Sequence, residues 1–216
     1  MALAKPILYS YFRSSCSWRV RIALALKGID YELKAVNLLT GEHLSPEFRE
    51  INPQAEVPAF VHSGHVLGHS VAILEYLEEV EPAHPLLPKD PASRAAVRAI
   101  VDSIVAGIQP LQNMRVLKYL ESNVTSWAKH WVEFGFESLE RSLQKTHGLY
   151  CFGDEVTLAD VCLVPQVFNG SRFDVDMKQF PLISEINNRL LQLKAFKTNH
   201  PFAQPDCPDN LKTNFE

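Results

Sequence analysis

Residues 11–24, YFRSSCSWRVRIAL, mark the point where an apolar strand ends and a helix begins. If the helix begins near Cys16, then Ser14 and Ser15 lie at its N-terminal end, where unpaired N–H groups and the helix dipole favour an anion. A hydroxyl donor at such a terminus also lowers the pKa of a thiol. The stretch therefore predicts a site for a sulfur anion, either that of Cys16 or that of a bound thiol. An ordinary serine N-cap beside a buried cysteine explains the local residues equally well.

The residues around this stretch alternate between strand and helix patterns. They predict strands at 5–11 and 30–38, two short strands within 57–68, and helices at 16–28 and 69–79. Gly28 suits the left-handed geometry that closes the first helix, and Ser70 is expected to cap the second. A turn at Ser63 and Gly64 separates the two short strands. Residues 1–82 are therefore expected to form an α/β domain, with a long loop after the second strand.

Residues 83–90 are expected to be a linker, because proline is frequent around them and disfavours helix in the preceding residue. The rest of the chain, residues 91–216, is expected to be all-helical. Thr157 and Asp160 have the spacing of a capping box at the start of one helix. Apolar residues at helical spacing predict two more amphipathic helices, and these residues are Val97, Ile100, Val101, Ile104, Val105 and Ile108, then Trp127, Trp131, Phe134, Leu139 and Leu143.

The composition excludes several function classes. A formal net charge of −4 over 216 residues argues against a nucleic-acid binder. The first residues contain no long apolar run, so neither a signal peptide nor a membrane span is expected. The four cysteines show no CxxC spacing, and free thiols in the cytoplasm are the expected state.

Two further features of the first domain suit an extended anionic ligand. Pro58 begins a predicted strand, where a cis bond would leave the Val57 backbone free to pair with a ligand. The helix that begins after Gly68 and His69 offers a second N-terminus, suited to a carboxylate. A sulfur site, an extended-backbone site and a carboxylate site together describe a tripeptide thiol.

With these features the chain resembles a known family. The element order, with Val57-Pro58 before the third strand, resembles the thioredoxin-like half of a cytosolic glutathione transferase. The similarity is closest to the zeta class, the maleylacetoacetate isomerases, and runs from about Lys5 to about Pro208. The segments that carry it are SSCSWRVRIALALKGIDYE, VPAF, SVAILEYLEE, GIQPLQN, GDEVTLADVCLVPQV and RFDVD. The resemblance implies a thioredoxin-like N-terminal domain followed by a helical C-terminal domain.

The resemblance also implies a role for individual residues. Glutathione is expected along the first domain, with Ser14 donating to its thiolate, Ser15 close behind and Cys16 tuning the site without acting as nucleophile. The Val57 backbone would pair with the cysteinyl part, and Ser70 would hold the γ-glutamyl carboxylate. The other implied glutathione contacts are His43, His69, Gln109 and Asn113. At two of these the sequence departs from the family, because His43 and His69 stand where glutamine is usual.

The implied activity is the cis–trans isomerisation of a small dicarboxylate, maleylacetoacetate, in the breakdown of tyrosine and phenylalanine. The thiolate adds to the cis double bond and is expelled after rotation, so glutathione acts as a nucleophilic catalyst. The substrate's carboxylates require cations, and arginine binds carboxylates in a bidentate manner. Arg13, Arg19 and Arg172 are the candidates, with a surface or structural arginine as the alternative for each.

Other readings remain open at this point. Family members also displace halide from α-halo acids, and they form homodimers. A thiol transferase that forms mixed disulfides through Cys16 is a second hypothesis, and a non-catalytic binding module on the same fold is a third. His62, His65 and His69 have a spacing that suggests a metal, but no carboxylate or cysteine lies near them in sequence, so no metal site is expected.

Overall fold

Residues 5–213 are described here by a computed structural model, and they form two compact units. The first unit contains the described residues up to Pro85 together with those from Lys194 on, and the second is Leu86–Leu193. The first boundary falls inside the expected linker at 83–90. The second differs from the expectation of one helical domain over 91–216, because the C-terminal segment from Lys194 belongs to the first unit.

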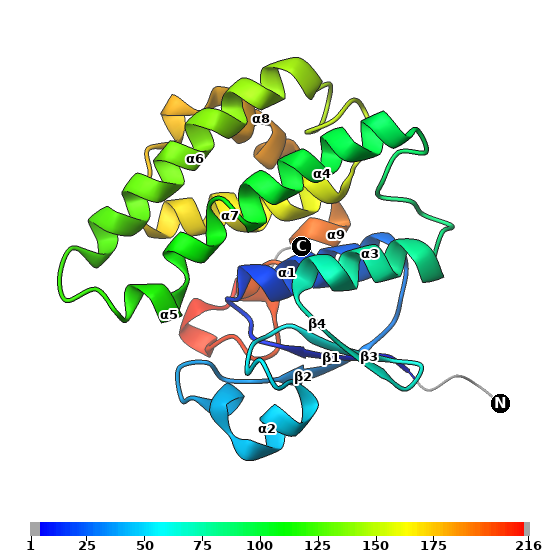
Figure 1. The fold of residues 1–216 in the computed structure, drawn as a ribbon, viewed down its shortest axis with the longest axis vertical. Coiled ribbons are helices and arrows are strands. Elements are labelled where there is room, and N and C mark those ends of the chain that lie inside the picture. Colours follow the sequence, from blue (N-terminus) through cyan, green and yellow to red (C-terminus); the bar gives the residue numbers. More distant parts are fainter. Residues whose placement is uncertain (1–4, 214–216) are drawn as a thin grey trace. The chain divides into compact units, whose positions relative to one another are not determined.

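A four-stranded sheet forms the centre of the first unit, with strands β1 (Ile7–Ser10), β2 (Glu32–Ala35), β3 (Ala59–His62) and β4 (His65–Gly68). The strand order is β2-β1-β3-β4; β2 is parallel to β1, and β3 is antiparallel to both β1 and β4. Helices α1 (Ser15–Leu26) and α3 (Ser70–Val80) lie side by side on one face, and α2 (Pro46–Ile51) lies on the other (Figure 1). The predicted α/β order is confirmed, and the unit has the thioredoxin-like arrangement.

The turns of this unit agree with the predictions from local sequence, except at the N-cap of α3 and in the long loop after β2. Gly28 has a φ of +68° directly after the end of α1, as expected, and Ser63 and Gly64 form the two-residue hairpin turn with φ of 50° and 81°. The N-cap of α3 is His69, and Ser70 is the first helical residue instead of the cap. The long loop contains α2, whose first turn is fixed by Ser45, which accepts a hydrogen bond from the Phe48 N–H at 3.1 Å.

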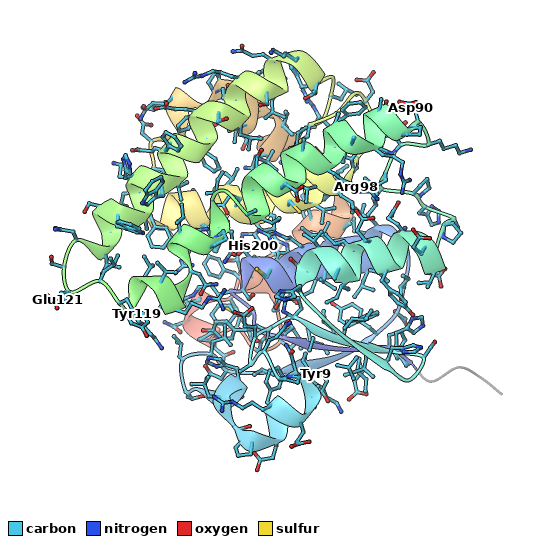
Figure 2. The ribbon with its side chains drawn as sticks, viewed as in Figure 1. Tyr9, Asp90, Arg98, Tyr119, Glu121 and His200 are labelled. Carbon is cyan, nitrogen blue, oxygen red and sulfur yellow. The ribbon has the colours of Figure 1, made fainter. Side chains whose placement is uncertain are left out.

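The second unit is all-helical, as predicted. Its helices are α4 (Pro91–Val105), α5 (Met114–Leu117), α6 (Val124–Thr146), α7 (Leu158–Arg172) and α8 (Pro181–Leu190). Asp90, labelled in Figure 2, caps α4 by accepting the Ser93 N–H at 2.8 Å. The apolar face predicted for α4 is buried, except that Val105 is only half-buried. Within residues 5–213, every helix is too short or too polar to cross a membrane.

The buried face of α6 differs from the predicted one. The positions with almost no exposure are Ala128, Val132, Phe136, Leu139 and Leu143. Trp127 and Trp131 are half-buried and Phe134 is 60% exposed, because they lie off the stripe that the 3.6-residue period defines. They form edge-to-face contacts with one another instead, with ring centroids 5.7 and 5.8 Å apart. The spacing of these apolar residues correctly predicted the helix, but Trp127, Trp131 and Phe134 are not among its fully buried side chains.

The capping box at the start of α7 is confirmed. The Asp160 carboxylate accepts the Thr157 N–H at 2.8 Å, the Thr157 hydroxyl at 3.0 Å and the Cys151 N–H at 2.9 Å. Burial raises the pKa of Asp160, while these hydrogen bonds act in the opposite direction. Both Cys151 and Cys162 are free and fully buried, and burial raises the pKa of Cys151 well above its ordinary value.

The C-terminal segment joins the first unit through contacts with α1 and the loop before it. The Arg21 guanidinium donates to the Asn199 carbonyl oxygen at 3.3 Å, and the Phe12 N–H donates to Asp206 Oδ2 at 2.8 Å. Trp18 packs edge-on against His200, labelled in Figure 2, with centroids 5.2 Å apart. Trp18 therefore packs α1 against this segment.

Candidate functional site

The serine–cysteine turn, defined here as Ser14, Ser15 and Cys16, opens α1. The helix begins at Ser15, and Ser14 is its N-cap, with Oγ accepting the Ser17 N–H at 3.2 Å. A hydroxyl carries one donor and two acceptor lone pairs, so the cap uses a lone pair and leaves the Ser14 proton able to donate. The serine cap and the anion site are therefore compatible in one side chain.

Exposure separates the members of this turn. Ser14 and Cys16 are half-buried, whereas Ser15 is 7% exposed. A ligand therefore reaches the hydroxyl of Ser14 and the thiol of Cys16 more readily than Ser15. Arg13, directly before the turn, is also half-buried.

Arg19 lies one helical turn after Cys16, and its side chain is 1% exposed. Its Nη1 donates to Ser70 Oγ at 3.2 Å and lies 3.7 Å from Cys16 Sγ. Ser70, the first residue of α3, is itself buried. The structure thus joins the predicted sulfur site to the predicted carboxylate site through one guanidinium. With 1% exposure, Arg19 does not suit the direct contact with a substrate carboxylate that was expected for it.

Val57 lies two residues before β3 and does not pair with β1 or β4. The Val57-Pro58 bond is cis, as expected. His69, between β4 and α3, is exposed and adopts a positive φ of 59°. His43 lies in the short helical turn Glu42–Leu44 and is half-buried. Val57, His69 and His43 therefore belong to the same unit as the serine–cysteine turn.

Three predicted contacts belong to the second unit. Gln109 begins a short 3-10 helix, Gln109–Gln112, and Asn113 caps α5 by accepting the Arg115 N–H at 3.1 Å. Arg172 ends α7; its Nη1 donates to Asn169 Oδ1 at 3.3 Å, and its guanidinium lies over the Phe173 ring. Arg172 is exposed.

The histidines that suggested a metal have other surroundings. His62 and His65 are directly paired across the β3–β4 hairpin, and His62 Nδ1 lies 3.0 Å from the Tyr76 hydroxyl. In the described part of the chain, three or more potential ligand side chains do not gather around any point.

Two residues important to the turn were missed from the sequence. Arg21 is fully buried on α1 and donates to Ser10 Oγ and to the carbonyl oxygens of Tyr11, Phe12 and Asn199. Asp206 holds the Phe12 N–H from the far end of the chain. Arg21 could have been noticed in the sequence as an arginine on the apolar side of a helix. No local pattern identifies Asp206.

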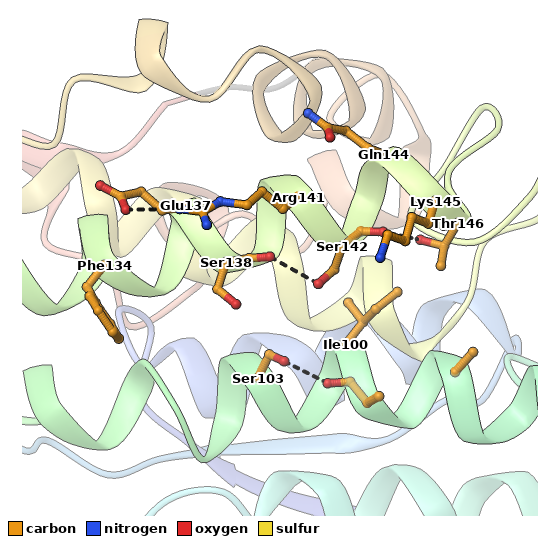
Figure 3. A pocket seen from close by; sticks show the side chains of 12 residues that line it. Ile100, Ser103, Phe134, Glu137, Ser138, Arg141, Ser142, Gln144, Lys145 and Thr146 are labelled. Carbon is orange, nitrogen blue, oxygen red and sulfur yellow. Dashed lines mark hydrogen bonds and ion pairs between the residues drawn. The ribbon is translucent and has the colours of Figure 1, made fainter.

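A groove of about 770 Å³ lies in the second unit between α4 and α6 (Figure 3). Its lining includes Ile100, Phe134, Arg141 and Lys145, and Figure 3 shows the Glu137–Arg141 pair along its edge. None of the candidate site residues lines this groove, so it is separate from the predicted chemistry.

Comparison with known proteins gives consistent results over the whole chain. Residues 4–79 match the family model "Glutathione S-transferase, N-terminal domain". The chain is 56% identical to the maleylacetoacetate isomerase of Rattus norvegicus over 216 residues, covering 99% of this chain and all of that one. A bacterial maleyl pyruvate isomerase, described as a zeta-class glutathione S-transferase in its holo form, is 42% identical with a TM-score of 0.90, covering 94% of this chain and 100% of that one.

A third relative was solved with ligands in its active site. It is maleylacetoacetate isomerase from Anaeromyxobacter dehalogenans, with bound dicarboxyethyl glutathione and citrate. That chain is 40% identical with a TM-score of 0.85, and the match covers 94% of this chain and 98% of that one.

Proposed function

Since the chain belongs to the zeta class of glutathione transferases, the maleylacetoacetate isomerase family, we propose that it isomerises maleylacetoacetate to fumarylacetoacetate with glutathione as cofactor. The observation that carries the proposal is the serine–cysteine turn at the N-terminus of α1, with the Ser14 proton able to donate. The dicarboxyethyl glutathione bound by the relative from Anaeromyxobacter dehalogenans supports it, because that ligand joins a glutathione sulfur to a dicarboxylate.

The residues of the first unit fit a tripeptide thiol. Ser14 and the N-terminus of α1 suit the sulfur, and the Val57 backbone, which pairs with no strand, suits the extended backbone of the ligand. Ser70, at the N-terminus of α3, suits the γ-glutamyl carboxylate. Arg19 Nε and Nη2 are buried and have no hydrogen-bond partner among the described residues, so an anion at this site would balance a buried positive charge.

Bound glutathione supplies a nucleophilic thiol that can add to a maleyl double bond and leave again after rotation. Ser14 donates a hydrogen bond that favours the deprotonated sulfur, and the N–H groups of the first turn of α1 add to this effect. Cys16 lies beside the sulfur site and tunes it. Arg13 and Arg172 bind the substrate's carboxylates as cations.

The experiment that tests the proposal follows the isomerisation of maleylacetone by absorbance, with and without glutathione. The wild type and the Ser14→Ala, Ser15→Ala and Cys16→Ala variants are compared. We expect turnover that requires glutathione, falls about 100-fold in Ser14→Ala and changes only several-fold in Cys16→Ala, in line with the loss of one donor to a developing anion. Absence of glutathione-dependent turnover in the folded wild type would contradict the proposal.

A second candidate function is thiol transfer through Cys16. The half-buried Cys16 thiol at the start of α1 favours it, because disulfide exchange needs a cysteine that a ligand can reach. Cys16→Ala distinguishes the two functions, since it removes disulfide exchange and leaves isomerisation substantially intact. A binding module without catalysis predicts glutathione binding and neither reaction.

The proposal extends to the pathway, the compartment and the oligomeric state of the protein. We place the reaction in tyrosine and phenylalanine breakdown in the cytoplasm, with α-halo acids as further substrates of the same thiolate. We also expect a homodimer, as in the family that the sequence resembles. Four free cysteines agree with a reducing compartment.

A further inference from the structure

Helix α1 carries two buried arginines, and their surroundings differ. Arg21 is 0% exposed, and its two terminal nitrogens donate to Ser10 Oγ and to three carbonyl oxygens. Burial lowers the pKa of Arg21 to about 10, with Tyr31 and Asp206 acting in the opposite direction. Arg21 is therefore a structural arginine that ties β1 and the loop before α1 to the C-terminal segment.

Arg19 is almost as buried, yet most of its donors are unused. Only Nη1 has partners, and Nε and Nη2 have none among residues 5–213. Among the same residues the guanidinium contacts a thiol and a hydroxyl and pairs with no carboxylate. A buried cation without a counter-charge is costly, and such groups are normally paired. The packing of α1 alone does not account for this side chain.

The position of Arg19 brings it close to the two places predicted for anionic groups of a thiol tripeptide, one for its sulfur and one for a carboxylate. Nη1 lies 3.7 Å from Cys16 Sγ at the start of α1 and 3.2 Å from Ser70 Oγ at the start of α3. Because Ser70 Oγ accepts from Arg19, the Ser70 proton points away from the guanidinium and can donate to a ligand. The charge of Arg19 thus lies near the N-termini of both α1 and α3, although Arg19 and Ser70 are 51 residues apart in sequence.

We infer that Arg19 is a positioning residue that orients Ser70 towards the carboxylate of bound glutathione and places one buried positive charge behind both the carboxylate and the sulfur. The inference rests on the proposed function and names a residue that acts through Ser70 and through its charge. It replaces the direct contact with the dicarboxylate substrate that the sequence had suggested for Arg19.

The test uses the full chain as wild type, Arg19→Met and Arg19→Lys. The pKa of the bound thiol is measured from its ultraviolet thiolate absorbance against pH, as the difference between complexes with glutathione and with S-methylglutathione, which lacks the thiol. In Arg19→Met we expect this pKa to rise by about one unit, because a nearby cation is lost. We expect Arg19→Lys to keep it near the wild-type value, because the charge remains.

Affinity gives a second readout that is specific to Ser70. S-methylglutathione keeps the carboxylate, so its binding to Arg19→Met is expected to weaken about tenfold. Arg19→Lys is expected to bind it less well than the wild type, because lysine is a point charge without the planar fork. Ser70→Ala is expected to weaken binding to a similar extent, and the loss in the double variant Arg19→Met/Ser70→Ala is expected to be smaller than the sum of the two single losses, since Arg19 acts in part through Ser70.

Each result decides between positioning and packing. A folded Arg19→Met variant with wild-type thiol pKa and affinity would overturn the inference, as would fully additive losses in the double variant. If Arg19→Met does not melt cooperatively, Arg19→Lys decides alone: a thiol pKa like that of free glutathione overturns the inference, and a retained wild-type value supports it. Failure of the wild type to bind glutathione overturns the proposed function instead, so the two failures are distinguishable.

Discussion

The backbone N–H of Phe12 donates to Asp206 Oδ2 at 2.8 Å, across 194 residues of sequence. Phe12 is two residues before Ser14, and Arg21 reinforces the same link by donating to the carbonyl oxygens of Phe12 and Asn199. The loop between β1 and the serine–cysteine turn is therefore fixed to the C-terminal segment, directly through Asp206 and indirectly through Arg21.

Replacing Asp206 tests this link. Asp206→Ala leaves the buried Phe12 N–H without its acceptor, which is expected to cost about 1–3 kcal/mol of unfolding free energy. The KM for glutathione is expected to rise as well, because Ser14 lies on the loosened loop. Thermal unfolding and steady-state kinetics measure the two effects. Asp209→Ala, a control at an exposed carboxylate in the same segment, is expected to change neither; equal behaviour of the two variants would contradict the role of Asp206.

The buried pair of Lys27 and Glu78 links the end of α1 to α3. Its atoms are 2.7 Å apart with side chains 1% and 5% exposed, and Lys27 also donates to the carbonyl oxygens of Glu81 and His84. Glu78→Gln leaves a buried cation with carbonyl partners alone and is expected to cost about 3–5 kcal/mol. The double variant Lys27→Met/Glu78→Leu is expected to lose much less than the sum of the single losses. Denaturant unfolding of the wild type, the single variants and the double variant measures these free energies. Additive losses of unfolding free energy would exclude a coupled pair.

His200 gives the unfolding free energy a specific pH dependence. Burial lowers the pKa of His200 to about 4, and the Arg21 charge acts in the same direction, from an ordinary value of 6.5. Between these values the unfolded histidine binds a proton and the folded one does not, so stability is present above pH 6.5 and is lost as the pH falls towards about 4.

The variant His200→Phe removes this proton uptake while keeping a ring against Trp18. Its melting temperature is expected to fall less than that of the wild type between neutral and mildly acidic pH. His65→Gln, which replaces an exposed histidine on β4, is the control and is expected to follow the wild type. If the melting temperatures of the wild type and His200→Phe fell equally with pH, His200 would be ruled out as the source of this pH dependence.

Gly135 allows α6 to approach the segment after α4 closely. A Cβ at this position would lie 2.3 Å from Ile108 Cγ1, and Ile108 is 1% exposed. Gly135→Ala is therefore expected to destabilise the protein by about 1–3 kcal/mol through overpacking, although alanine favours helix. Adding Ile108→Ala should recover part of the loss in denaturant unfolding. Ser138→Ala, at an exposed position of the same helix, is expected to be neutral, and a neutral Gly135→Ala would show that α6 can shift.

Sequence patterns predicted the features that depend on residues close together in the chain. The left-handed Gly28, the hairpin at Ser63 and Gly64, and the Thr157–Asp160 capping box each involve contacts over at most a few residues. Helix α2 was not predicted, although its signal is local. Ser45 is its N-cap and Pro46 its first helical residue. The N-cap of α3 was misplaced by one residue, which is the usual precision of a boundary argued from propensity.

The chain therefore determined by itself its strands, most of its helices and the serine–cysteine turn, because hydrogen bonding and apolar periodicity are local. Only the tertiary structure decided that residues from Lys194 on belong with the sheet unit, that Phe134 is exposed, and that Arg19 contacts Ser70. Such contacts join segments tens to hundreds of residues apart. They form only where burial of apolar surface outweighs the entropy of bringing those segments together, and no short stretch of sequence records that balance.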